Sequence, residues 1–160
     1  MQYVLLLTLC LILPTFVHAQ IIINEIAWMG TVPKEGESTQ AAANNEWIEL
    51  YNNGSEAVSL EGWRVMTEDE GLSFTISDTI AAGGYFLLER GNDDVVPNIA
   101  ADVIYPFKNN ALGNSGEKLF LKDGGGVIID TVDALMGWPA GNNTTKETMQ
   151  HQGSTWVTAS

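Results

Sequence analysis

The stretch Asn44-Asn45-Glu46-Trp47-Ile48-Glu49-Leu50-Tyr51-Asn52-Asn53-Gly54 decides the fold class of this 160-residue chain. Polar and apolar residues alternate through it, and a period of two is typical of a β-strand with one buried face. Ile48 and Leu50 point to one face of that strand. The strand ends in Asn-Asn-Gly, whose residues tolerate the positive φ angles of a tight turn. The residues on the opposite face are Trp47, Glu49 and Tyr51.

Short strand candidates recur along the rest of the chain, separated by Gly-, Asn- and Asp-rich turns. No segment shows the 3.6-residue apolar period of an amphipathic helix, and residues 31–45 read as a long loop with at most one helical turn. Many short strands with tight turns predict an all-β sandwich or barrel. The candidates are residues 21–28, 46–51, 63–67, 73–76, 85–89, 102–104, 118–122, 127–132 and 155–158.

The first 19 residues differ from the rest and are predicted to be a signal peptide. Residues 3–13 are apolar, and Val17-His18-Ala19 resembles a cleavage site, although Lys and Arg are missing from the N-terminal region. The apolar run is too short to span a bilayer, so we expect cleavage near Ala19 and a secreted or cell-surface product with no membrane span. An uncleaved anchor is the alternative. Residues 20–160 then form one domain, with a core over about 21–135 and a looser extension over 137–160.

Composition narrows the range of partners. The chain has 20 Asp and Glu against 7 Lys and Arg, which gives a net charge of −13. Such a charge repels nucleic acids and anionic membrane surfaces, so neither is expected as a partner. The single cysteine, Cys10, lies in the predicted signal peptide, so the mature domain would have no disulfide. A secreted domain without cysteine is more typical of bacteria than of small eukaryotic ectodomains.

Several short motifs, in the same order, resemble the lamin tail domain family in its bacterial secreted form. The resemblance implies an immunoglobulin-like, Greek-key β-sandwich. It also implies a non-catalytic module of the kind found beside secreted nucleases and hydrolases, with no catalytic residues to transfer. The motifs are Ile-Asn-Glu-Ile at 23–26, Asn-Glu-Trp-Ile-Glu-Leu-Tyr-Asn at 45–52, Leu-Glu-Gly-Trp-Arg-Val at 60–65, residues 80–88 and residues 112–119.

Reaction chemistry finds little support, so the protein is predicted not to be an enzyme. After the predicted signal peptide the chain has no cysteine and one histidine, His151, which excludes a Cys–His pair and a metal site built on several imidazoles or thiolates. Glu46 and Glu49 could form a glycosidase pair only if they shared a face, and the strand pattern places them on opposite faces. Glu25 is expected to be partly buried and hydrogen-bonded.

No cofactor is expected, although residues 68–70 and 91–94 carry oxygen ligands that suit a weak extracellular calcium site. Trp63 is predicted to fill the core between the sheets. The candidate surface-binding residues are Trp28, Trp47 and Tyr51. The predicted function is binding or anchoring to a protein or cell-envelope component. Two alternatives are a carbohydrate-binding module that uses exposed tryptophans, and an accessory domain of a larger secreted hydrolase.

Overall fold

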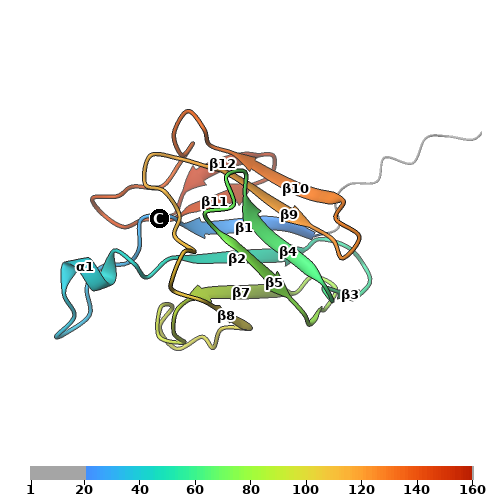
Figure 1. Ribbon diagram of the computed structural model, residues 1–160, viewed down its shortest axis with the longest axis horizontal. Helices are drawn as coiled ribbons and strands as arrows, with labels where there is room; N and C mark the ends of the chain where they lie inside the picture. The colour runs from blue at the N-terminus through green and yellow to red at the C-terminus, as the bar shows by residue number, and fades with distance from the viewer. Residues whose placement is uncertain (1–20, 160) are drawn as a thin grey trace, which may run out of the picture.

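Two packed β-sheets form the body of the protein in the computed structural model, which describes residues 21–159 (Figure 1). The larger sheet has six strands in the order β12-β11-β1-β2-β7-β8. Its neighbouring strands are antiparallel, except that β7 and β8 are parallel. The strands of this sheet are β1 (Ile21–Ala27), β2 (Trp47–Asn52), β7 (Tyr85–Arg90), β8 (Val103–Tyr105), β11 (Met149–Gln152) and β12 (Thr155–Thr158).

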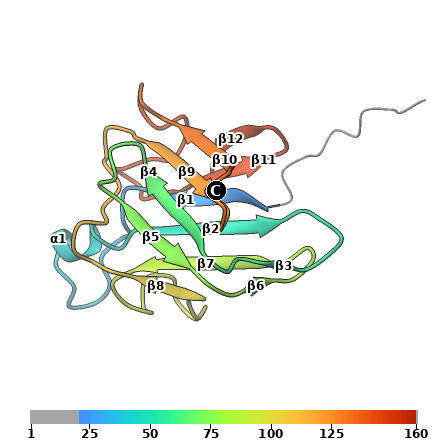
Figure 2. The same cartoon turned by 45° about the vertical axis from the view of Figure 1, so that its right-hand side comes forward.

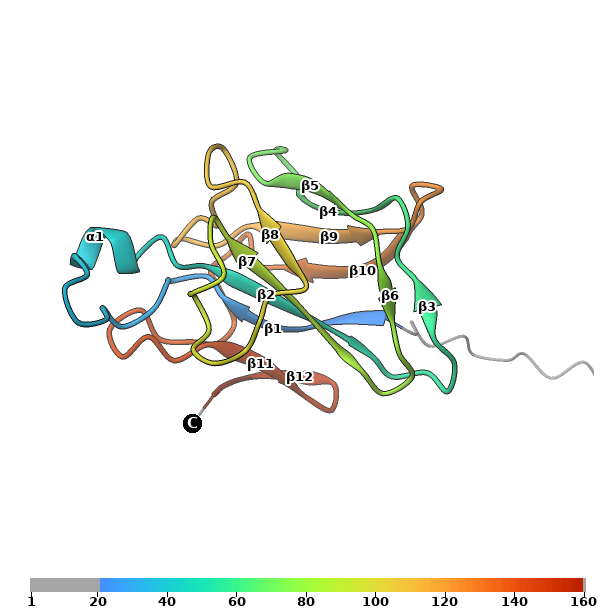
Figure 3. The ribbon, with the colours of Figure 1, turned by 90° about the horizontal axis from the view of Figure 1, so that it is seen from below.

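The smaller sheet has four strands in the order β10-β9-β4-β5. The chain passes from the larger sheet to the smaller after β2, returns at β7, passes over again after β8 and returns at β11. Figure 3 shows the two layers from the side, and they confirm the predicted all-β, immunoglobulin-like, Greek-key sandwich. The strands of the smaller sheet are β4 (Trp63–Thr67), β5 (Ser73–Ile76), β9 (Lys118–Lys122) and β10 (Ile128–Asp133).

Two small elements lie at opposite ends of the sandwich (Figure 2). At one end, β3 (Val58–Ser59) and β6 (Thr79–Ile80) form a two-stranded ribbon. At the other end, the long loop after β1 contains one helical turn, α1 (Thr39–Ala42), as the sequence predicts. Ser38 caps this turn by accepting a hydrogen bond from the Ala41 N–H (3.1 Å).

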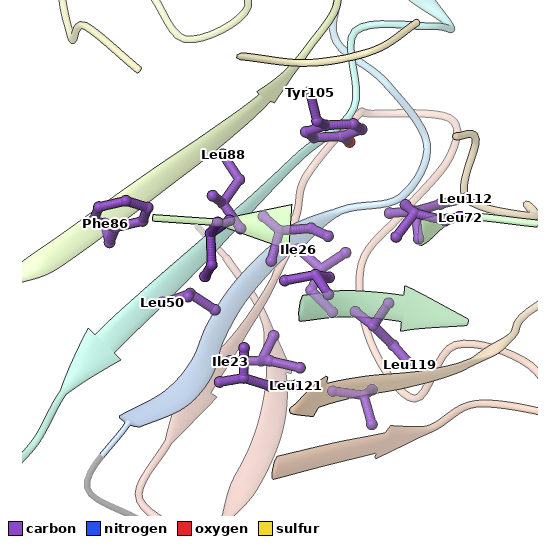
Figure 4. Packing of buried hydrophobic residues seen from close by; sticks show 14 of the residues in the cluster. Ile23, Ile26, Leu50, Leu72, Phe86, Leu88, Tyr105, Leu112, Leu119 and Leu121 are labelled. Carbon is purple, nitrogen blue, oxygen red and sulfur yellow. The ribbon is translucent and has the colours of Figure 1, made fainter. Parts of the chain in front are cut away.

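The core lies between the two sheets and consists of aliphatic side chains with a few aromatic rings. Figure 4 shows Ile26 and Leu50 of the larger sheet together with Leu119 and Leu121 of the smaller one. The strand that the alternation predicts is confirmed, because Ile48 and Leu50 are fully buried while the intervening residues of β2 are half-buried. The hydrophobic effect on these inner faces therefore holds the sandwich together.

The sequence analysis does not predict three of the strands, β3, β6 and β11. The first two have only two residues each, which is too short for a period to be recognised. β11 reads Met-Gln-His-Gln, without the β-branched residues that mark strands. As a result, the segment 137–160, which the sequence presents as a looser extension, contributes β11 and β12 to the larger sheet.

Trp63 lies at the edge of the core, although the sequence predicts that it fills the space between the sheets. It shares the inner face of β4 with the fully buried Val65, but it lies at the start of the strand and is only half-buried. The ring therefore packs against the margin of the core and does not fill the space between the sheets.

A hydrogen bond joins the two sheets where β1 passes β10. The Ile23 N–H donates to Asp130 Oδ2 (2.7 Å). Both strands have a register shift at this point, between Ile23 and Glu25 in β1 and between Ile128 and Asp130 in β10. β11 pairs with β1 only at Glu25 and Ile26, so it does not extend to Ile23. The Asp130 carboxylate therefore accepts the hydrogen bond of a backbone N–H that would otherwise have no partner strand.

We expect Asp130→Ala to lower the free energy of unfolding by about 2 kcal/mol, because a partly buried N–H loses a charged acceptor. Urea denaturation measures the loss, and amide exchange at Ile23 locates it. Asp130→Asn retains an oxygen at the same place and is expected to lose less. Equal losses in the two variants would show that the hydrogen bond to Ile23 is not the cause.

The predicted signal peptide (residues 1–19) lies outside the described residues. Among residues 21–159, no helix is long and apolar enough to cross a membrane.

Candidate functional site

A groove of about 390 Å³ lies on the outer face of the larger sheet, over β1, β2 and β7. One wall comes from the long connection between β7 and β8, in which Ile99 is 57% exposed. The groove thus combines a rigid floor of strands with an apolar wall, which is typical of binding sites. Its lining residues are Glu25, Trp47, Glu49, Tyr85, Leu87, Val96, Ile99 and Asp102.

A β-bulge places Glu25 in this groove. The register between β1 and β2 shifts at Asn24, so Asn24 and Glu25 both leave the inner face, although strict alternation would bury Glu25 beside Ile23. Glu25 then lies directly opposite Glu49 of β2. The bulge therefore brings together two carboxylates that stand far apart in the sequence.

Each of the two carboxylates has one neutral hydrogen-bond donor. The Asn24 side-chain amide donates to Glu49 Oε1 (2.7 Å), and the Thr148 hydroxyl donates to Glu25 Oε1. Burial raises the pKa of Glu25, and the Thr148 hydrogen bond opposes that rise. Burial also raises the pKa of Glu49, the Asn24 hydrogen bond opposes the rise, and the charge of Glu25 adds to it. Like charges that face each other across a ladder are unfavourable, so this pair favours a proton or a bound cation.

Aromatic rings flank the carboxylate pair. Trp47 lines the groove, and Tyr51 packs against Tyr85 with ring centroids 4.8 Å apart and planes tilted by 31°. Tyr85 is 60% exposed. Two of the three predicted surface-binding residues, Trp47 and Tyr51, therefore lie on the same face of the sheet as Glu49, as the alternation indicates.

Trp28 does not join this surface. It is only 7% exposed, its indole N–H donates to the Ala140 carbonyl (3.1 Å), and its ring stacks on Trp138 with a centroid distance of 5.9 Å. The expectation that Trp28 is a surface residue is therefore wrong. The residue follows β1 and is covered by the C-terminal segment, which the sequence does not place there.

Glu46 faces away from the groove, as predicted, and lies in the core. Its carboxylate pairs with Arg90 (Oε1 to Nη1, 3.2 Å) and accepts the Leu112 N–H at Oε2 (2.8 Å). Arg90 also donates to the Phe107 carbonyl from Nη2 (2.9 Å) and lies over the Phe107 ring. Glu46 and Glu49 point to opposite sides of the sheet, so they cannot act together on one substrate.

His151 lies in β11 and packs against Trp156, with ring centroids 4.0 Å apart. It contributes no side chain to the groove lining. Within residues 21–159, no group of three or more His, Cys, Asp or Glu side chains is arranged to hold a metal ion. The acidic loops use their oxygens locally: Asp69 Oδ1 accepts the Thr67 hydroxyl and the Gly71 N–H, and Asn92 Oδ1 accepts the Asp94 N–H.

A larger hollow of about 490 Å³ lies between the loop that precedes α1 and the loop that follows β7. Its lining is polar and belongs to surface loops, without aromatic rings. The groove over β1, β2 and β7 is the better candidate, because half-buried carboxylates with raised pKa values mark functional sites more often than solvated loop residues do. The residues that line the larger hollow are Lys34, Glu35, Gly36, Glu37, Asn45, Asn92 and Asp94.

Comparison with known proteins identifies the domain. Residues 14–135 match the sequence profile of the lamin tail domain, which confirms the resemblance of the motifs. The chain belongs to the lamin tail domain family. Lamin tail domains are immunoglobulin-like and generally non-catalytic. In this lamin tail domain, β11 and β12 lie beyond the matched residues, and so does Thr148, which directly precedes β11 and donates its hydroxyl to Glu25 at the edge of the groove.

No curated protein matches this lamin tail domain. Among solved structures, a DUF4876 family protein from Bacteroides thetaiotaomicron is similar over 65% of this chain, with 12% identity and a TM-score of 0.45. The chain covers 42% of that protein, which is less than half of its length.

The sequence analysis misses the partners of Trp47 and Tyr51 in the groove. Tyr85 and Leu87 fall in a predicted strand, but no pattern reveals that this strand pairs with β2. Ile99 and Val96 come from a loop whose path no periodicity describes. The one trace of the bulge in the sequence is that Asn24 and Glu25, two successive polar residues, interrupt the alternation of β1 where the register shifts.

We expect this lamin tail domain to be more stable near about pH 5.5 than near about pH 8. Burial raises the pKa of Glu46 to about 7, against a hydrogen bond from Leu112 and the charge of Arg90, and burial also raises the pKa values of Glu25, Glu49, Glu89 and Glu117. Between the ordinary glutamate pKa and these raised values, the folded state holds protons that the unfolded chain has released. The free energy of unfolding therefore falls as the pH rises through this window, by on the order of 3 kcal/mol for Glu46 alone.

Urea denaturation across this pH range measures the effect. Asp69 and Glu37 have lowered pKa values and act in the opposite sense, but only below their ordinary values of 3.8 and 4.5. Glu46→Gln should flatten the pH dependence. A wild-type stability that rises from the acidic to the alkaline end would contradict the prediction.

Proposed function

We propose that this lamin tail domain is a secreted, non-catalytic binding module. Its outer groove would receive a Lys or Arg side chain, flanked by apolar residues, of a protein in the cell envelope or outside the cell. The observation that carries the proposal is the direct pairing of Glu25 and Glu49 across β1 and β2 in a partly apolar groove. Secretion rests on the predicted signal peptide.

A cation would relieve an unfavourable arrangement in the groove. When both carboxylates are ionised, they repel each other, and their burial removes part of the water that would screen them. A guanidinium or ammonium between them supplies the missing charge and hydrogen-bond donors, since each carboxylate accepts several donors. The net charge of −13 raises the encounter rate with basic partners.

The rest of the groove suits the neighbours of that cation. Trp47 and Tyr85 offer aromatic faces, which attract cations and pack against apolar side chains. Ile99 and Leu87 offer aliphatic contacts at the wall and the floor. A ligand with one basic group and adjacent apolar groups therefore matches both kinds of lining.

The test uses end-blocked peptides in which one Arg is flanked by Leu and Trp, titrated against the purified chain by calorimetry. We expect the double variant Glu25→Gln/Glu49→Gln to bind at least about tenfold more weakly, because the charged partners in a partly desolvated site are lost. The matched control is Glu35→Gln/Glu70→Gln, which removes the same charge from two exposed loop positions. Equal weakening in both double variants, or no binding by the wild type, would refute the proposal.

Carbohydrate binding is the second candidate, and the tilted pair Tyr51–Tyr85 beside Trp47 favours it, since aromatic faces stack on sugar rings. Titration with soluble polysaccharides distinguishes the two. For a carbohydrate ligand, Trp47→Ala and Tyr85→Ala should abolish binding while Glu25→Gln/Glu49→Gln retains it. The further possibility of accessory duty in a larger secreted hydrolase predicts that the same groove binds that enzyme's substrate.

A further inference from the structure

The six-stranded and four-stranded sheets end in the edge strands β12, β8, β10 and β5. An edge strand presents unpaired backbone groups and can pair with another chain, and native proteins protect such edges by shortness, charge, bulges or a covering loop. Three of these edges carry such protection. β12 does not.

The three protected edges differ in their device. β8 has only three residues. β10 contains Asp130 and Asp133 together with a register shift, so it is both charged and irregular. On β5, the outward N–H of Ser73 donates to the Asn110 side chain (2.9 Å), which comes from the loop after β8.

The free side of β12 carries a defined set of backbone groups. The Ala159 N–H donates to the Thr148 carbonyl (2.9 Å), so Ala159 faces β11. Because backbone directions alternate along a strand, Trp156 and Thr158 point their N–H and C=O groups away from β11. In the described part of the chain, β12 has no second neighbour in its sheet, so these groups face the open side. Figure 3 shows this strand at the outer margin of its layer.

The chemistry of this hairpin favours pairing with an identical strand. β12 reads Thr-Trp-Val-Thr, and β-branched and aromatic residues are those that strands prefer. From Thr148 to Ala159 there is no Asp, Glu, Lys or Arg, although the whole chain carries a net charge of −13. Two copies of a strongly acidic protein repel each other least where neither surface is charged. Trp156 packs against His151 and the core, which holds the strand in a fixed shape.

We propose that the free edge of β12 pairs with the same edge of a second copy of this chain, antiparallel about a two-fold axis. In the register that matches Trp156 of one copy with Thr158 of the other, the outward N–H and C=O groups of both residues are used, and the two Val157 residues lie opposite each other. Such an interface is isologous and closes at two copies, because each edge is consumed by the other. The two larger sheets become one continuous sheet, and the two grooves are held in fixed relation to each other.

Sedimentation velocity on the purified chain tests the proposal over a concentration series up to about 100 μM, where a micromolar complex is saturated. We expect the wild type to reach twice the mass of one chain. Thr158→Pro removes the outward N–H, and Pro is tolerated on an edge strand, so it should remain monomeric over the same range. Thr158→Val is the matched control, because it removes the same hydroxyl, which accepts the Gly141 N–H, and keeps the backbone donor. It should dimerise like the wild type.

A wild type that stays monomeric overturns the proposal, and so does a Thr158→Pro variant that dimerises as strongly as Thr158→Val. Amide exchange on the wild type keeps the test decisive if Thr158→Pro fails to fold. The Trp156 and Thr158 amides should gain protection as the protein concentration rises, while the amides on the exposed side of β10 do not. Protection that is independent of concentration at Trp156 and Thr158 would also overturn it.

Discussion

Arg90→Met should destabilise the fold by about 3 kcal/mol near about pH 8 and by clearly less near about pH 5.5, because it breaks a buried ion pair. The side chains of Arg90 and Glu46 are only 6% and 5% exposed. Met retains the aliphatic stem, so the change removes the charge, the hydrogen bonds to the Phe107 carbonyl and the contact with the Phe107 ring.

The pH dependence follows from Glu46. Burial raises the pKa of Glu46 to about 7 while Arg90 lowers it, so removal of Arg90 moves this pKa further upward. When the pKa of a carboxyl group is higher in the folded state than in the unfolded state, the free energy of unfolding falls as the pH rises between the two pKa values. At acidic pH the group is protonated, and the variant is spared the cost of an unpaired buried charge.

The double variant Arg90→Met/Glu46→Gln is the control for this prediction. It has no charge at either position and retains an oxygen for the Leu112 N–H. Urea denaturation should show that the double variant is more stable than Arg90→Met near about pH 8. Its free energy of unfolding should also vary less with pH, because Gln does not titrate. If the double variant is as unstable as Arg90→Met at alkaline pH, the charge of Glu46 is not the source of the loss.

Gly116→Ala should lower the free energy of unfolding by about 3 kcal/mol or more, since the new methyl group meets backbone atoms that cannot turn aside. Gly116 has a φ of +106°, and a Cβ there would lie 2.0 Å from the Ala134 carbonyl oxygen and 2.8 Å from the Gly137 Cα. The turn before β9 packs at this point against the turn after β10. Trp138, whose indole N–H donates to the Gly113 carbonyl, is anchored in the same place.

Gly83→Ala is the matched control for Gly116→Ala. Gly83 also has a positive φ, +65°, but a Cβ there meets nothing within 4 Å. Gly83→Ala should lower the free energy of unfolding by only about 1–2 kcal/mol, which is the cost of placing a residue with a side chain in the left-handed conformation. Chemical denaturation measures both variants, and the difference between them is the cost of the close approach. Equal losses would show that conformation alone, and not contact with the Ala134 carbonyl, demands glycine at position 116.

The sequence predicts most of the strands because apolar and β-branched residues gather in short runs between Gly-, Asn- and Asp-rich turns, and because burial alternates along β2 and β9. Trp63–Thr67, Ser73–Ile76, Lys118–Lys122 and Thr155–Thr158 are predicted with their observed bounds. The sequence analysis does not predict β11, because this strand lacks apolar alternation of its own. It is held in the sheet by its pairing with β1. Strand pairing depends on contacts between distant segments, and a period within one segment does not encode it.

The candidate site follows the same division. Alternation in β2 places Trp47, Glu49 and Tyr51 on one face, and the structure confirms it. The partnership of Glu49 with Glu25 could not be predicted, since it requires both the pairing of β1 with β2 and a bulge at Asn24. The prediction for Trp28 is wrong for a related reason, because the residues that cover it, Trp138 and Ala140, lie more than a hundred positions further along the sequence.

The position of β1 within the larger sheet has a consequence for the timing of folding. This strand is the first of the described chain, yet one of its two neighbours, β11, begins at Met149, and their ladder joins Glu25 to Gln150. Loop closure over such a separation is entropically costly, and high contact order slows folding. During synthesis, β1 therefore lacks this neighbour until the ribosome has added β11, more than a hundred residues later. A nascent chain that stops short of Met149 presents that open side, including the hydrophobic Ile26, to chaperones and proteases.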